Sequence, residues 1–127
     1  GDFLIRNLLG ADQTTGAVAV GEVVQEGQTV QFQLRDAVSA SQEFNALLAA
    51  DHARHRHPPL GALMFSCCGR GQGLFGKPNH DAGTASARLG AIPLAGFFAQ
   101  GEIGPIGGRN FLHGYTASLA LFAERDC

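Results

Sequence analysis

The segment at residues 60–68 (LGALMFSCC) is apolar almost throughout and is bounded by strong interruptions on both sides. Pro58 and Pro59 precede it and end any helix approaching from the N-terminal side, because proline lacks a backbone N–H and restricts the residue before it. The glycine-rich segment at residues 69–76 (GRGQGLFG) follows it. A short apolar run bounded in this way is typical of a strand covered on both faces, so the sequence predicts the central strand of a sheet here.

The hydrophobic pattern predicts further strands and two helices around this central strand. Strands are expected at residues 3–9, 17–24, 29–36, 92–100 and 110–122, and helices at about 40–55 and 81–89. Residues 29–36 alternate, with Val30, Phe32 and Leu34 on one face. Ser39 has capping-box spacing to Gln42 and is the expected N-cap of the first helix. The sequence therefore predicts an α+β domain of order βββ-α-β-α-ββ, with a mainly antiparallel sheet and its helices packed to one side.

Composition excludes several classes of protein. Eighteen of the 127 residues are glycine, but they follow no three-residue period and 45% of residues are hydrophobic, which favours a compact domain with many turns. The formal net charge is -2 and there is no basic run, so nucleic acid is not an expected partner. No apolar stretch approaches the roughly 18 residues of a membrane span. Three cysteines, two of them adjacent (Cys67, Cys68 and Cys127), do not suggest a disulfide framework, so we expect a cytoplasmic protein.

Residues 71–78 approach two phosphate-binding motifs without completing either. Gly71, Gly73 and Gly76 spell GxGxxG, but the next predicted strand does not end in the acidic residue that a dinucleotide site needs. The same residues up to Lys77 spell GxxxxGK, but Pro78 stands where a P-loop has a hydroxyl group for magnesium. No nucleotide cofactor is expected.

Histidines and cysteines offer two further kinds of chemistry, and both have ordinary structural explanations. His52, His55 and His57 could hold zinc, but cationic side chains at a helix end also suit the helix dipole, so no metal is expected. Cys67 or Cys68 could act as a nucleophile only if the fold brings a base such as His80 or His113 near it. Because buried cysteine is common, we do not expect an enzyme, and thiol catalysis is the minor alternative.

Two glycine-rich segments, residues 69–76 and 101–110, each follow an apolar strand and each carry an arginine. The guanidinium groups of Arg70 and Arg109 suit a carboxylate, and Glu102 could bind an ammonium group. If both segments meet at one end of the sheet, they would form a site for a small zwitterion such as an amino acid. A structural ion pair between Glu102 and Arg109 is an equally good explanation, and hairpin turn chemistry explains the glycines without a ligand.

Four segments carry a family resemblance: GALMFSCCGRGQGLFG (61–76), HD (80–81), PLAGFFAQGEIGP (93–105) and NFLHGYTASLALF (110–122). They resemble the C-terminal half of the FIST sensory domain, which occurs in bacterial signalling proteins and in an F-box protein of eukaryotes. The opening segments DFLIRNLLGAD and GQTVQFQLRDA are also similar, so the likeness covers essentially the whole chain. The candidate ligand-binding residues are Cys67, Gly69, Arg70, Gly71, His80, Gly101, Glu102, Gly104, Arg109 and Asn110.

The resemblance implies a sensory module of a signal-transduction protein that binds a small molecule, with amino acids proposed as ligands. It also implies a single domain over residues 1–127, which we expect to be a piece of a longer protein with a FIST N-like half before it as its partner. The F-box relative suggests the alternative, a protein-interaction module that docks a partner or substrate chain. No catalytic residue, metal or cofactor is expected.

Overall fold

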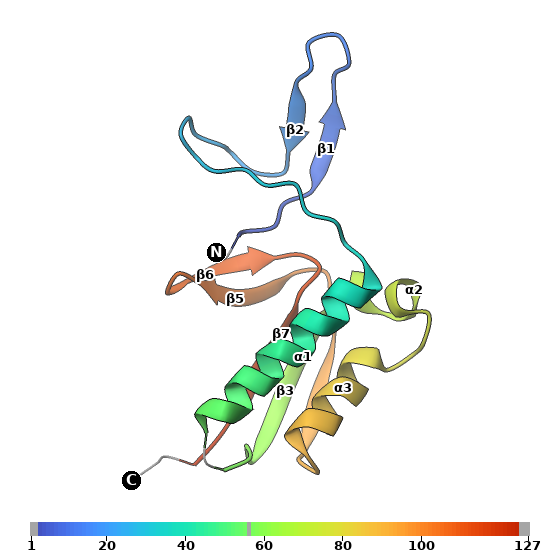
Figure 1. Ribbon diagram of the computed structural model, residues 1–127, viewed down its shortest axis with the longest axis vertical. Helices are drawn as coiled ribbons and strands as arrows, with labels where there is room; N and C mark the ends of the chain where they lie inside the picture. The colour runs from blue at the N-terminus through green and yellow to red at the C-terminus, as the bar shows by residue number, and fades with distance from the viewer. Residues whose placement is uncertain (1–2, 56, 125–127) are drawn as a thin grey trace.

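A three-stranded sheet of order β4-β3-β7 lies at the centre of the computed structural model, which describes residues 3–55 and 57–124 (Figure 1). Its middle strand is β3 (Gly61–Cys67), which pairs in parallel with β4 (Leu94–Ala99) and antiparallel with β7 (Ala117–Phe122). The prediction of a central strand over the apolar run is therefore confirmed. Gly1, Asp2 and Cys127 lie outside the described residues.

Two helices, α1 (Ala37–Arg54) and α3 (His80–Leu89), pack on the same face of this sheet (Figure 1). Helix α1 begins three residues earlier than predicted because the Asp36 carboxylate accepts the backbone N–H groups of Val38 and Ser39 and is the true N-cap. Helix α3 ends as predicted at Gly90, whose positive φ of 85° suits glycine. No helix in the described ranges is long and apolar enough to cross a membrane.

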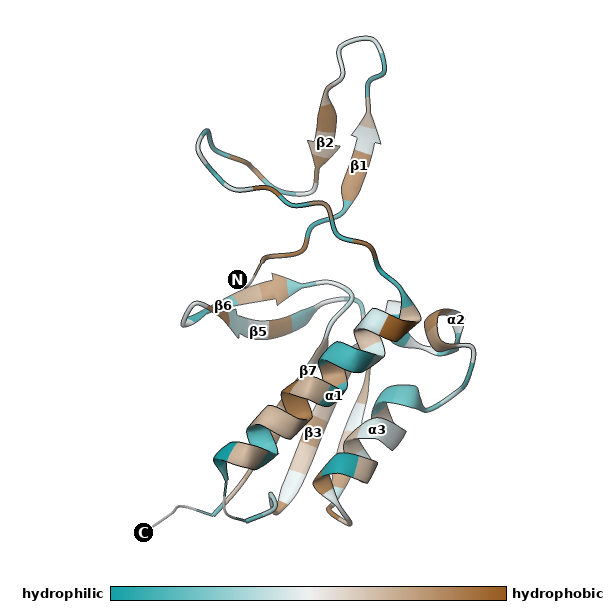
Figure 2. Cartoon of the chain, in the orientation of Figure 1, coloured by the Kyte–Doolittle hydropathy of each residue, from teal (hydrophilic) through white to brown (hydrophobic). Residues whose placement is uncertain are grey.

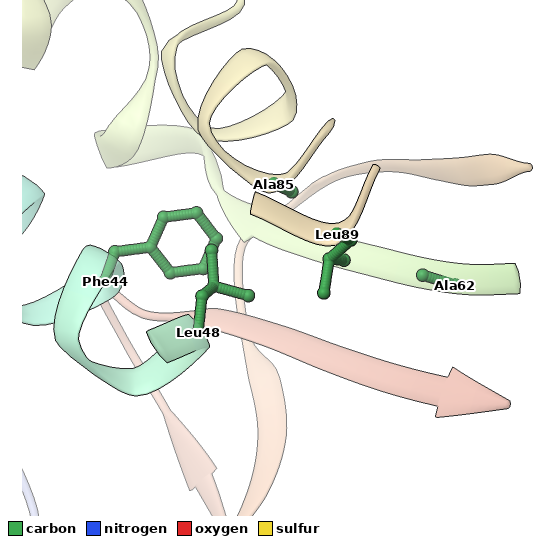
Figure 3. Packing of buried hydrophobic residues seen from close by; sticks show 5 residues of the cluster. All are labelled: Phe44, Leu48, Ala62, Ala85 and Leu89. Atoms are coloured by element: carbon green, nitrogen blue, oxygen red, sulfur yellow. The ribbon is translucent and has the colours of Figure 1, made fainter. Parts of the chain in front are cut away.

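The core lies between these helices and the sheet (Figure 3). Its buried members are Phe44, Leu48, Ala62, Ala85 and Leu89. Side chains alternate along a strand, so Ala62, Met64 and Ser66 of β3 share the helix-facing side. Burial of this one face is what holds α1, α3 and the sheet together.

The face of the sheet opposite the helices is exposed. The prediction that β3 is covered on both faces is therefore correct for the helix-facing side and wrong for the other side. Leu63, Phe97 and Phe122 have 37%, 66% and 53% of their surface exposed. The rings of Phe65 and Phe97 meet edge to face on this side, with centroids 5.1 Å apart. Apolar character in β3 therefore indicates two apolar faces, only one of which this chain covers itself.

The N-terminal hairpin of β1 (Leu8–Ala11) and β2 (Val18–Val20) projects away from the sheet and helices and carries hydrophobic residues on both strands (Figures 1 and 2). β1 begins five residues later than the strand predicted at 3–9 and continues two residues beyond it, and β2 is shorter than the segment predicted at 17–24. The third predicted strand is wrong: residues 29–36 form no strand, and Val30, Phe32 and Leu34 are exposed. Alternation gives a segment two faces, but a strand also needs a neighbour to share backbone hydrogen bonds.

A second hairpin replaces the loop predicted at residues 101–110. Strands β5 (Glu102–Ile106) and β6 (Arg109–His113) pair antiparallel across a turn at Gly107 and Gly108, both with positive φ, which is typical of a two-residue hairpin turn. The strand predicted over 110–122 is accordingly split into β6 and β7.

The glycine-rich segment after β3 forms the 3₁₀ turn η1 (Cys68–Arg70) and the short helix α2 (Gln72–Phe75). The α+β class is confirmed, and the described residues form three antiparallel pairings and one parallel pairing.

Candidate functional site

Both glycine-rich segments start at the same edge of the central sheet. Cys67 and Ala99, the last residues of the parallel strands β3 and β4, are partners in register. Because the carboxyl ends of parallel strands meet at one edge, the chain leaving β3 and the chain entering β5 lie there together. This edge is the place where open sheets with parallel strands most often bind ligands. The geometric condition for a shared site is therefore met at this edge.

Glu102 occupies this edge and is almost completely buried, with 2% of its surface exposed. One carboxylate oxygen, Oε2, accepts the hydroxyl group of Thr116 at 3.0 Å and its backbone N–H at 3.4 Å. The other oxygen, Oε1, is buried and has no hydrogen-bond partner among the described residues. Burying a carboxylate oxygen without a hydrogen-bond donor costs free energy. Glu102 Oε1 can therefore accept a hydrogen bond from a group that is not among the described residues.

Cys67 and Gly69 border the same edge. The backbone N–H of Cys67 donates to the Thr116 carbonyl oxygen at 2.9 Å, and the Cys67 sulfur accepts the N–H of Gly69 at 3.4 Å. Cys67 is buried and Cys68 is exposed, so the two thiols do lie in different environments. His113 directs Nε2 to the Gly104 carbonyl oxygen at 2.9 Å. His113 makes no hydrogen bond to either thiol among the described residues.

Arg35 and Tyr115 complete this edge and were missed by sequence reasoning. Arg35 donates from Nη1 to the Gly69 carbonyl oxygen at 3.2 Å, and its guanidinium lies 4.3 Å from the centre of the Tyr115 ring. A Cβ atom at Gly69 would come within 2.7 Å of Arg35 and 2.9 Å of Tyr115, so a larger residue here would displace these two side chains. The only signal in the sequence was the place of Tyr115 in the motif NFLHGYTASLALF.

Arg70 does not face this edge. Its side chain is 7% exposed and forms a bidentate ion pair with Asp81, which is 5% exposed: Nε lies 2.8 Å from Oδ2, and Nη2 lies 3.0 Å from Oδ1. Phe44 and Phe75 lie under the guanidinium, with ring centres 5.7 and 5.4 Å away. The predicted role of Arg70 in holding a ligand carboxylate is therefore replaced by a buried contact between η1 and α3.

Burial and hydrogen bonding act in opposite directions on Asp81. Desolvation raises the pKa of this carboxyl, but the hydrogen bonds from Arg70 and His80 outweigh it and hold the pKa below its usual value. Ser66 adds a further hydrogen bond from Oγ to Oδ2 at 3.1 Å. Asp81 is therefore ionised at neutral pH and accepts hydrogen bonds only.

His80 connects this carboxylate to a serine on the other helix. Its Nδ1 lies 3.0 Å from Asp81 Oδ1, and its Nε2 lies 3.1 Å from Ser41 Oγ. The Phe75 ring stacks on the imidazole, with centroids 3.6 Å apart and planes 8° apart. Sequence reasoning named His80 as a candidate but gave no signal for Ser41, which lies 39 residues away on a helix surface.

Arg109 lies at the wrong end of its hairpin to act with Glu102. In the register of β5 and β6, Glu102 is opposite His113, whereas Arg109 is opposite Ile106 beside the turn. The described residues therefore contain no ion pair between Glu102 and Arg109. Asn110 lies at the same distant end, opposite Pro105.

Of the remaining glycine candidates, Gly101 has a close neighbour, whereas Gly71 and Gly104 have room for a Cβ atom at ordinary contact distances. A Cβ atom at Gly101 would come within 2.9 Å of the Leu112 side chain, and one at Gly104 would contact the His113 ring at 3.6 Å. Gly71 is the N-cap of α2 and lies beside the Phe98 ring. No group of three or more His, Cys, Asp or Glu side chains within the described residues could hold a metal ion.

Comparison with known proteins gives one family. The model of the FIST C domain matches residues 1–105. The uncharacterized protein Rv0628c of Mycobacterium tuberculosis is 57% identical over 124 residues, which cover 98% of this chain and 32% of that protein. The uncharacterized protein Mb0898c of Mycobacterium bovis is 56% identical over the same length and the same shares. This chain thus spans about a third of the length of these relatives.

Proposed function

Because this chain belongs to the FIST C domain family of sensory and signal-transduction domains, we propose that it binds a free amino acid at the edge of the central sheet beside Glu102. The observation that carries the proposal is the buried Glu102 carboxylate, whose Oε1 has no partner in the part of the chain that the structure describes. An ammonium group would supply the missing donor and would compensate the charge.

Arg35 is the group proposed for the other end of the ligand. It replaces Arg70 and Arg109, because Arg35 already lies at this edge, bonded to Gly69 and stacked on Tyr115. Its guanidinium donates one hydrogen bond in the structure and has further N–H groups for a carboxylate. A ligand with both charges would therefore join the chain segment before α1 to the start of β5.

Isothermal titration calorimetry of this chain against the common amino acids tests this proposal. Glu102→Gln keeps the shape of the side chain and removes its charge, so it should weaken binding at least tenfold. Arg35→Met should weaken it similarly by removing the carboxylate contact. Glu26→Gln, at an exposed glutamate, is the matched control and should bind like the original chain. Absence of binding, or equal affinity in Glu102→Gln and Glu26→Gln, would contradict the proposal.

A second candidate function is docking of another part of a longer polypeptide, and the open sheet face favours it. Leu63, Phe97 and Phe122 are exposed together there, and β4 is an edge strand with its outer backbone groups unpaired in the sheet. Exposed apolar patches and long apolar edge strands are unusual in a protein that works alone. The relatives are about three times as long as this chain, which supports a covering segment within the same polypeptide.

Hydrogen exchange distinguishes this alternative from ligand sensing alone. The amides of β4 should exchange at least tenfold more slowly in the longer protein than in this chain, because docking would pair or cover them. The amides of α3, which already pack against α1, provide the internal control. Equal exchange of β4 in both proteins would exclude docking at this face.

A further inference from the structure

We propose that Ser41, His80 and Asp81 form a hydrolytic triad in which Ser41 is the nucleophile toward small acyl esters. This activity goes beyond the sensory role and departs from the expectation that the chain is not an enzyme. The site lies between α1 and α3, on the helix-covered side of the sheet, and shares no side chain with the edge beside Glu102.

The two hydrogen bonds of His80 set the direction of proton transfer. Asp81 is ionised and can only accept hydrogen bonds. The imidazole Nδ1, which lies 3.0 Å from Asp81 Oδ1, must therefore carry a proton and donate it in a hydrogen bond to this oxygen. In the neutral ring this leaves a lone pair on Nε2, which faces Ser41 Oγ at 3.1 Å. The serine hydroxyl therefore donates to Nε2. A nucleophile, a base and an orienting carboxylate in this order are the parts of a serine hydrolase, on whatever fold they occur.

The supporting contacts hold this relay in one geometry. Arg70 and Ser66 fix the Asp81 carboxylate with three hydrogen bonds of 2.8 to 3.1 Å. Phe75 stacks on the His80 ring, whose side chain is only 7% exposed. Such fixed and water-poor surroundings are what a catalytic relay needs, because a loosely held base loses alignment with its nucleophile.

A hollow of about 530 Å³ lies beside this relay and is lined by its base, His80. Asn45, one helical turn after Ser41 on α1, also lines it and donates from its side chain to the Ser41 carbonyl oxygen at 2.9 Å. Ser41 itself is half-buried. Lys77 and Arg88 also line the hollow. Two cationic side chains favour esters whose acyl part carries a carboxylate over neutral esters.

The reaction balances without any co-reactant except water. Ser41 Oγ attacks the ester carbonyl carbon while its proton moves to His80 Nε2. The ester C–O bond then breaks, and the leaving alkoxide takes that proton and departs as an alcohol. Water next attacks the acyl-serine and gives a proton to Nε2, the bond between Oγ and the acyl carbon breaks, and Nε2 returns that proton to Oγ. The products are a carboxylic acid, an alcohol and the original serine.

Two p-nitrophenyl esters test the triad, the acetate and the monoester of glutaric acid. Hydrolysis should release p-nitrophenol faster from the glutaric monoester than from the acetate. Mass spectrometry of a reaction quenched early should find the acyl group on the peptide that contains Ser41. Ser41→Ala should reduce the enzymatic rate to the solution background. His80→Gln should lower the rate by about 10²–10⁴-fold, the usual worth of a general base.

Ser39→Ala is the matched control, because Ser39 is an exposed serine one half-turn earlier on the same helix. It should retain the original rate and the acyl mass on the Ser41 peptide. Circular dichroism of each variant shows whether it folds. A folded original chain that hydrolyses neither ester faster than Ser41→Ala, or that is acylated elsewhere, would overturn the proposal.

Discussion

Removing one partner of the buried Arg70–Asp81 pair should lower the free energy of unfolding by about 3–5 kcal/mol, because the remaining charge is left uncompensated. Arg70 and Asp81 are 7% and 5% exposed and share two hydrogen bonds. In Arg70→Met the side chain keeps most of its length, but Asp81 retains only Ser66 and His80 as donors. Urea unfolding followed by circular dichroism measures the loss, provided that the dependence on denaturant is unchanged.

Two further variants locate the cause of that loss. Arg70→Lys keeps the charge but cannot form the bidentate contact, so its loss should fall between zero and that of Arg70→Met. The double variant Arg70→Met with Asp81→Leu removes both charges and should recover most of the stability. Its recovery would show that the penalty comes from an isolated charge rather than from lost packing.

The surface pair of Arg6 and Glu22 is the control for burial. It has the same 2.8 Å separation, but its side chains are 24% and 44% exposed. Glu22→Gln should therefore cost much less than Arg70→Met, because solvent screens an exposed ion pair. If Arg70→Met cost no more than Glu22→Gln, burial would not govern the strength of these pairs and the account of Arg70 as a structural residue would fail.

Three other changes have expected outcomes that urea or acid unfolding can check. The pKa of Asp81 is lower in the folded than in the unfolded chain, so its contribution to the free energy of unfolding should be complete above about pH 4 and lost as pH falls through the folded pKa. Asp81→Asn should weaken this dependence of stability on acid. An unchanged pH profile in that variant would contradict the account. Gly96→Ala would overlap a carbonyl oxygen of β3 and should cost about 3 kcal/mol or prevent folding, whereas Gly73→Ala has open space around it and should be nearly neutral. Leu48→Ala should cost about 2–5 kcal/mol, but Leu47→Ala, on a side chain 63% exposed, should cost less than 1 kcal/mol.

The elements that sequence predicted well are those whose pattern and partners both lie within this chain. Strand β3 is apolar at nearly every position, and it finds β4 and β7 on its two sides. Helices α1 and α3 have an apolar side that meets this sheet. Residues 29–36 have an equally clear alternation but remain without a strand partner. The hydrophobic pattern indicates which face of a segment could be buried. Whether that face is buried depends on whether the fold places another element against it.

The location of the candidate site could be predicted, but its contacts could not. Glycines directly after two apolar strands indicated the edge where Gly69 and Glu102 lie, because strand ends in parallel register meet there. The direction of each charged side chain was not encoded in the spacing. Arg70 follows the strand by three residues, and the 3₁₀ turn η1 directs it toward α3 rather than toward Glu102. Arg109 is separated from Glu102 by the length of a hairpin that the glycines themselves create.

Alternation at the end of β3 explains how one strand can support two separate sites. Ser66 shares the helix-facing side of the sheet and binds Asp81, whereas the next residue, Cys67, has the opposite direction and lies beside Thr116. The two sites therefore meet β3 at adjacent residues, Ser66 and Cys67, whose side chains point to opposite faces of the sheet. Since no side chain is shared, loss of ester hydrolysis in Ser41→Ala and loss of ligand binding in Glu102→Gln should be independent. A Ser41→Ala protein that also lost amino-acid binding while remaining folded would show that the two faces form one site.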